Sequence, residues 1–228
     1  MSAAVRRYRA VLAYEGTAYH GFQRQAGETP TIQGAVEAAI RQVTGQPATV
    51  IGAGRTDAGV HASGQVIAFD VAWRHETDDL LRALNARLPT DIALQSIAVA
   101  EPGFHPRFDA RSRTYVYRFY ARRIRHPLWD RCRWRIAPPL DVTAMQRAAA
   151  LLVGEHDFAT FGQPTPGEST VRRVTVSAVI DEGDDRYAYT ITANAFLGRM
   201  ARSIVGTLAE VGRGAMALSL ATVAVGAS

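Results

Sequence analysis

The sequence predicts an α+β fold of two units with similar outlines, on three observations. The chain has 228 residues, enough for one large or two small domains. Segments that alternate apolar and polar residues are interspersed with segments whose apolar residues recur every three or four positions. Prolines and a glycine gather within residues 100–107, as is typical of a boundary. We therefore expect an N-terminal unit over residues 1–104 and a C-terminal unit over residues 105–228.

The first unit has the predicted order β-α-β-β-α-β, the ferredoxin-like pattern that RNA-recognition folds also use. Strands are expected at residues 8–14, 48–53, 65–71 and 91–99. Thr31 can cap a helix with one apolar face, which Gly45 and Pro47 end. Thr77 can cap a second helix that carries four leucines on one face.

The second unit repeats this outline less clearly. Strands are expected at residues 114–121, 158–161, 171–180 and 186–195. Asp141 can cap a helix that runs to Val153, and another helix is expected from Arg199 to Val211, where Gly212 stops it. Residues 216–228 are small and alanine-rich, and they give no assignment.

Basic residues outnumber acidic ones by 26 to 21, and every basic residue is arginine. Without lysine, the chain has no lysine Schiff base, no lysine-bound pyridoxal phosphate and no phosphate-binding loop of the lysine type. The codon usage of a GC-rich genome would give this composition. Arginine also suits phosphate binding and base stacking better than lysine does. Composition alone does not separate the two explanations.

The positive charge is concentrated in residues 105–135, which contain ten arginines and two aspartates, a net charge of +8. The rest of the chain carries a net charge of −3. Seven aromatic residues are interleaved with these arginines. RNA-binding proteins combine arginine for phosphates with exposed rings for base stacking, so the segment favours RNA as a partner. A solvated basic face over core aromatics is the alternative.

The chain contains one cysteine, Cys132, so an intrachain disulfide is impossible. The longest wholly apolar run, residues 148–153, is far shorter than the ~20 residues of a membrane-spanning helix. No apolar run of signal-peptide length follows the N-terminal arginines. We expect a cytoplasmic protein with no membrane partner.

One loop contains the residues most suited to chemistry, the segment Gly52-Ala-Gly-Arg-Thr-Asp-Ala-Gly-Val-His61. It starts like a dinucleotide fingerprint, but Asp57 occupies the place of the third glycine and no helix pattern follows. The six histidines and the cysteine show no metal-ligand spacing, and no serine elbow occurs. An ionised Asp57, two residues after Arg55, could act as a nucleophile or general base. An aspartate in a surface Asx-turn is the alternative.

Within this loop, the segment Ala53-Gly-Arg-Thr-Asp-Ala-Gly-Val-His61, followed by Gly64-Gln-Val66, resembles the catalytic motif of the TruA family of tRNA pseudouridine synthases. Other segments resemble that family in the same order: Tyr14-Glu-Gly-Thr17, Gly21-Phe-Gln-Arg-Gln25, Thr31-Ile-Gln33, Phe104-His105, Arg113-Thr-Tyr-Val-Tyr117, Gly154-Glu-His-Asp-Phe158, Asn194-Ala-Phe196, Met200-Ala-Arg-Ser-Ile-Val-Gly206 and Glu210-Val-Gly212. The resemblance covers roughly residues 8–214.

The resemblance implies two α/β units whose antiparallel sheets meet around a central basic cleft. It implies isomerisation of uridine to pseudouridine at positions 38 to 40 of the tRNA anticodon stem-loop, without a cofactor, by a homodimer. Asp57 matches the family's essential aspartate, Tyr115 the tyrosine that stacks on the target base, and Arg202 the basic residue that pairs with the aspartate. Arg55 and Arg24 are expected to contact RNA.

The chain departs from the family pattern in two places. Leu197-Gly-Arg199 stands where the family usually has polar or histidine residues. Family members also continue for several tens of residues beyond the segment that matches residues 210–212, so the C-terminal unit is expected to lack its usual final strand. A catalytically silent RNA-binding module is the competing interpretation. A small-molecule enzyme of the same fold is disfavoured by the basic segment.

Overall fold

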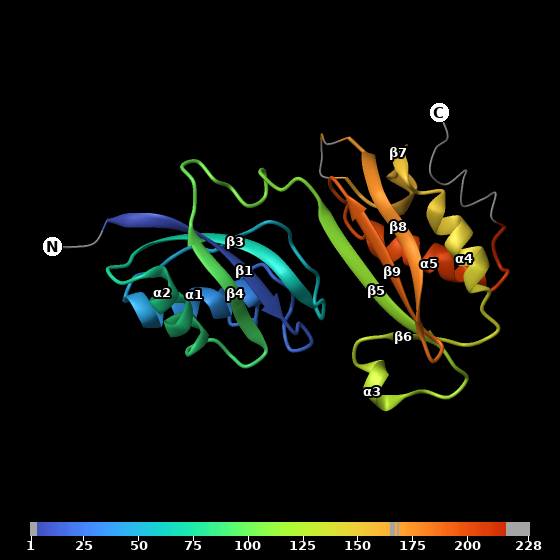
Figure 1. The fold of residues 1–228 in the computed structure, drawn as a ribbon, viewed down its shortest axis with the longest axis horizontal. Coiled ribbons are helices and arrows are strands. Elements are labelled where there is room, and N and C mark those ends of the chain that lie inside the picture. The colour runs from blue at the N-terminus through green and yellow to red at the C-terminus, as the bar shows by residue number, and fades with distance from the viewer. Residues whose placement is uncertain (1–3, 165–166, 168, 218–228) are drawn as a thin grey trace. The chain divides into compact units, whose positions relative to one another are not determined.

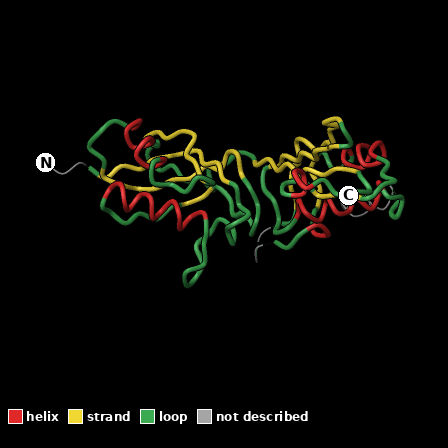
Figure 2. The backbone as a smooth tube through the Cα atoms, turned by 90° about the horizontal axis from the view of Figure 1, so that it is seen from below, coloured by secondary structure: helices red, strands yellow, loops and turns green. Residues whose placement is uncertain are grey.

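The computed structural model describes residues 4–164, 167 and 169–217. The chain divides into two compact units between Ala110 and Arg111. Both units combine helices with strands, as the colours of Figure 2 show. The fold is therefore mixed α+β, as predicted from the sequence. Among the described residues, no helix is long and apolar enough to cross a membrane.

The first unit is a four-stranded antiparallel sheet with two helices (Figure 1). In chain order its elements are β1 (Val5–Tyr14), α1 (Ile32–Thr44), β2 (Ile51–Gly52), β3 (Ala62–Ala72), α2 (Thr77–Asn85) and β4 (Ile92–Val99). The strand order is β2-β3-β1-β4, and every neighbouring pair is antiparallel. Alternate residues of β1, from Tyr8 to Tyr14, are buried in one core with apolar residues of both helices.

The ends of the two helices explain why they form where they do. The side chain of Thr31 accepts a hydrogen bond from the Gly34 amide, and Gly45 ends α1 in the left-handed conformation with φ of 71°. Both features were predicted. The predicted cap of α2 was wrong: Thr77 is the first helical residue, and Glu76 is the N-cap without a side-chain hydrogen bond. Acidic residues in the first turn stabilise this end of α2 instead, because their negative charge interacts favourably with the helix dipole.

The second unit is a five-stranded mixed sheet. Its elements are β5 (Arg113–Ala121), α3 (Pro127–Asp130), β6 (Trp134–Ile136), α4 (Val142–Ala150), β7 (Gly154–Asp157), a 3₁₀ turn (Ala159–Phe161), β8 (Val171–Gly183), β9 (Arg186–Ala193) and α5 (Met200–Gly212). The strand order is β6-β5-β9-β8-β7. The expectation of a wholly antiparallel sheet was wrong here, because β5 and β6 are parallel.

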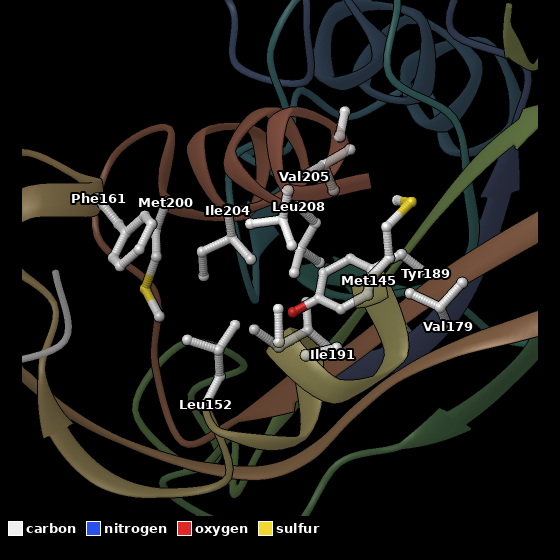
Figure 3. Close-up of a cluster of buried hydrophobic side chains, with 14 of the residues drawn as sticks. Met145, Leu152, Phe161, Val179, Tyr189, Ile191, Met200, Ile204, Val205 and Leu208 are labelled. Atoms are coloured by element: carbon white, nitrogen blue, oxygen red, sulfur yellow. The ribbon is translucent and has the colours of Figure 1, made fainter. Parts of the chain in front are cut away.

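One core joins the sheet of the second unit to α4 and α5. Figure 3 shows Met145 of α4 and Leu208 of α5 in one cluster with Tyr189 and Ile191 of β9. The predicted strand at 158–161 was wrong. Residues 154–157 form β7, and the buried rings of residues 158 and 161 lie three apart on a 3₁₀ turn. Gly212 is the last residue of α5. Residues 218–228, on which the expectation of a missing final strand depends, lie outside the described residues.

Candidate active site

The loop of residues 53–61 joins β2 to β3 and carries Arg55 and Asp57. Its first residues continue the pairing of the two strands. The Ala53 amide donates to the Val66 carbonyl at 2.8 Å, and the side-chain amide of Gln65 donates to the Gly54 carbonyl at 2.6 Å. The sheet therefore fixes the point from which the loop departs.

A second loop, residues 15–31, holds the first loop from another side. The Phe22 amide donates to the Thr56 carbonyl at 3.0 Å, and the Gly59 amide donates to the Tyr19 carbonyl at 3.2 Å. The hydroxyl groups of Tyr14 and Thr56 are 2.8 Å apart and share a hydrogen bond. Thr56, the residue before the candidate catalytic aspartate, is thus bonded through both its backbone and its side chain.

Two glycines allow the loops to approach this closely. A Cβ on Gly16 would lie 2.1 Å from the Val60 carbonyl oxygen, a separation that real side chains do not show. Gly21 has φ of 97°, in the left-handed region, and a Cβ there would lie 2.7 Å from the Thr56 carbonyl oxygen. Glycine at both positions is therefore a requirement of the contact between the loops.

The outcome is a fixed backbone with exposed side chains. Thr56 is partly buried, whereas Arg55 and Asp57 on either side of it are exposed. The Asp57 carbonyl accepts the Val60 amide at 3.2 Å and closes a turn that contains Gly59 with φ of 76°. This turn uses the backbone carbonyl of Asp57. A carboxylate on a rigid loop suits an attacking group or a base.

Arg24 belongs to the loop of residues 15–31. Its backbone amide donates to the Gln33 side chain at 2.8 Å, and its guanidinium pairs with Glu37 at 3.1 Å. The arginine side chain remains 65% exposed. An exposed ion pair contributes at most about 1 kcal/mol, so Glu37 orients Arg24 without preventing contact with a phosphate.

Tyr115 and Arg202 belong to the second unit. Tyr115 lies on β5, half-buried, and its ring packs edge-on against Phe196 at a centroid distance of 4.7 Å. Arg202 is exposed in the first turn of α5, after the N-cap residue Arg199. A cation at a helix N-terminus is disfavoured by the helix dipole. The helix dipole therefore does not stabilise Arg202 at this position.

The predicted site residues thus fall into two groups. Arg55 and Asp57 share one loop, and Arg24 lies on the loop hydrogen-bonded to it. The residues that hold these loops, such as Tyr14 and Thr56, were not predicted, because hydroxyl groups 42 positions apart give no local signal. In the described ranges, no three histidine, cysteine, aspartate or glutamate residues are grouped to hold a metal ion.

A family model described as tRNA pseudouridine synthase matches residues 10–109 and 148–225. The chain belongs to the tRNA pseudouridine synthase family. The two ranges of this chain that the family model matches contain Arg24, Arg55, Asp57 and Arg202. Tyr115 lies between the two ranges.

Curated members of the tRNA pseudouridine synthase family are similar over most of their length. The tRNA pseudouridine synthase A of Brevibacillus brevis is 45% identical over 215 residues, which cover 92% of this chain and 86% of the relative. The enzyme of the same name from Moorella thermoacetica is 44% identical, over 89% of this chain and 82% of the relative. That of a Caulobacter species is 41% identical, over 91% and 84%.

Proposed function

We propose that the chain converts uridine to pseudouridine at positions 38 to 40 of the tRNA anticodon stem-loop and that Asp57 is the catalytic group. Family membership makes the chain an isomerase that acts on uridine in tRNA. The observation that supports the role of Asp57 is its exposed side chain on a backbone held by hydrogen bonds from β3 and from the loop of residues 15–31. The nucleotide positions rest on the resemblance described above.

The reaction rearranges one bond and needs no co-reactant. The bond from N1 of uracil to C1′ of ribose breaks, and a bond from C5 to C1′ forms. C5 loses its proton, and N1 gains one, so atoms and charge balance. An ionised Asp57 can begin this sequence by attacking the sugar, by attacking the base, or by removing the 2′ proton. Each route needs a carboxylate at a fixed place beside the nucleotide.

The other candidate residues have roles in binding. The target base must leave the RNA stack before it can turn, and an aromatic ring such as that of Tyr115 supports the flipped base. Arg202 would pair with the Asp57 carboxylate and orient it. Arg55 and Arg24 would contact phosphates. The proposal includes a basic cleft in which one uridine reaches residues of both units. We also propose that the protein acts as a homodimer in the cytoplasm.

The decisive experiment maps pseudouridine in unmodified tRNA transcripts after incubation with the wild-type chain. We expect pseudouridine at positions 38 to 40 and none in a matched transcript with cytidine at those positions. Product at other uridines would overturn the positions alone. Absence of product, with retained tRNA binding, would overturn the catalytic assignment and favour a silent RNA-binding module.

Three variants test the binding roles. Tyr115→Phe keeps the ring and should keep most of the turnover, whereas Tyr115→Ala should lose it. Arg202→Gln should lower turnover strongly. Arg147→Gln is its matched control, because Arg147 is an exposed arginine on α4. Equal turnover in Arg202→Gln and Arg147→Gln would contradict the role of Arg202.

A further inference from the structure

A short arginine-rich segment leaves the sheet of the second unit and contains α3. We call residues 122–133 the α3 loop; Figure 1 shows α3 outside the sheet. It lies in residues 110–147, between the two ranges that the family model matches. Nothing in the proposed chemistry uses this loop, and five of its twelve residues are arginine.

Trp129 anchors the α3 loop to the sheet. The guanidinium of Arg122 lies 4.8 Å from the centre of a Trp129 ring, and that of Arg186 on β9 lies 5.2 Å away. The ring of His126 stacks on Trp129 at 4.0 Å with an angle of 14°, and Tyr120 of β5 contacts it edge-on. The indole thus joins residues of the loop to two strands.

Polar contacts fasten both ends of the α3 loop. Arg122 pairs with Asp185 at 3.1 Å, and Arg133 pairs with Glu182 at 2.6 Å, both on the β8–β9 hairpin. At the centre, Asp130 accepts a hydrogen bond from Tyr120. These contacts fix the loop and consume the charge of two of its arginines.

The three other arginines of the loop, Arg123, Arg125 and Arg131, are exposed. Within the described part of the chain, none of them forms an ion pair, and the nearby Asp130 is engaged by Tyr120. The three guanidinium groups therefore project from a loop whose backbone is already fastened, and guanidinium groups are well suited to bind phosphates.

We propose that the α3 loop is a second RNA-binding site. It binds the phosphate backbone of the substrate tRNA at a place distant from the target uridine. The proposal rests on the proposed function for the identity of the RNA. It assigns Arg123, Arg125 and Arg131 to backbone contacts and Trp129 to a positioning role. Backbone contacts add affinity without selecting the base, so the loop acts on binding and leaves the chemical step unchanged.

The test compares two triple variants with the same change in net charge. The first is Arg123→Gln, Arg125→Gln and Arg131→Gln. The control is Arg41→Gln, Arg87→Gln and Arg147→Gln, three exposed arginines on or beside other helices. Binding of tRNA is measured against salt concentration, and kcat and KM are measured separately.

In the loop variant, we expect the slope of log Kd against log salt to fall by about 2 to 3, because each phosphate contact contributes about 0.7 to 0.9. Kd and KM should rise about tenfold or more, with kcat unchanged. The control should change the slope by less than half as much. Equal slopes in the two triple variants, or an unchanged slope in the loop variant, would overturn the proposal. Binding is measured without turnover, so this result stands apart from any failure of catalysis.

A single variant tests the positioning role. Trp129→Ala keeps every arginine of the loop but removes the ring that anchors it, so the salt slope should fall by about 1 or more. Trp129→Phe keeps an aromatic ring and should restore most of the slope. A wild-type slope in Trp129→Ala would overturn the role of Trp129, as would equal slopes in both Trp129 variants.

Discussion

A methyl group at Gly16 should displace the loop that carries Asp57. In Gly16→Ala the new Cβ would lie 2.1 Å from the Val60 carbonyl oxygen and 2.7 Å from the Val60 carbonyl carbon. Ordinary van der Waals separations are about 3.5 Å, so the two loops must separate by about 1.4 Å. Both contacting atoms of Val60 belong to the backbone, so a change of side-chain rotamer does not relieve the overlap.

The hydrogen bonds between the loops set the size of the effect. Gly16 donates to Nδ1 of His61 at 3.1 Å, and Gly59 donates to the Tyr19 carbonyl at 3.2 Å. A separation of about 1.4 Å breaks both bonds, each with a net contribution of about 0.5–1.5 kcal/mol. We therefore expect the 228-residue chain to lose about 1–3 kcal/mol of its free energy of unfolding, or about 2–12 °C in melting temperature. A misplacement of about 1 Å near the reacting group lowers turnover about 100-fold.

Thermal unfolding and pseudouridine formation, measured well below the melting temperature, test this prediction. Gly64→Ala is the control for stability, because its methyl group meets no described atom within 4 Å and its melting temperature should stay within about 2 °C of the wild type. The reasoning is refuted if Gly16→Ala melts with the wild type and retains its turnover.

Two further predictions concern the second unit. Gly206→Ala adds a methyl group that meets no described atom within 4 Å, so it should raise the free energy of unfolding by about 0.5–1 kcal/mol. Gly212→Ala places its Cβ 2.8 Å from the Met145 sulfur, so it should lower the free energy of unfolding by about 1–3 kcal/mol. Chemical denaturation that gave both changes the same sign would contradict this packing. Burial raises the pKa of Tyr189 above its ordinary value of 10.0. The contribution of the neutral Tyr189 side chain to the free energy of unfolding is therefore complete below about pH 10 and is lost as the pH rises further. Tyr189→Phe, which also removes the hydrogen bond to Ser177 at a cost of about 1 kcal/mol, should flatten that alkaline loss in pH-dependent denaturation, and an unchanged profile would count against the assignment.

Local signals made the first unit predictable. Thr31 and Gly45 mark the two ends of α1 through hydrogen bonds to nearby backbone groups. Both ends of that helix can therefore be predicted from the local sequence. The cap at Thr77 was predicted one residue late, because acidic residues in the first turn replace a side-chain cap. Boundaries that depend on a single hydrogen bond are harder to place than the helix itself.

The second unit depended more on distant contacts. Residues 122–136 read only as a basic segment, yet they contain α3 and β6. Parallel pairing of β6 with β5 has no local pattern, because the two strands meet through tertiary packing. Residues 158–161 looked like a strand because both terminal phenylalanines are apolar, but the spacing of three buries both rings from one 3₁₀ turn.

The sequence predicted which residues belong to the candidate site, but not how the loops that carry them are held together. The glycine-rich pattern around Asp57, with the resemblance, was enough to single out the aspartate. The hydrogen bond between Tyr14 and Thr56 and the contact of Gly16 with Val60 join segments more than 40 positions apart. Such contacts follow from the fold and have no signature in either segment.

The most direct test of the account is turnover by Asp57→Asn. Asparagine keeps the shape of the side chain and removes its charge, so the folded protein should still bind tRNA through arginine–phosphate contacts and base stacking. Pseudouridine formation should fall by several orders of magnitude, about 10³-fold or more, while Kd changes by less than about tenfold, equivalent to ~1.4 kcal/mol. If the wild type is active and folded Asp57→Asn forms pseudouridine at a near-normal rate, Asp57 is not the catalytic group.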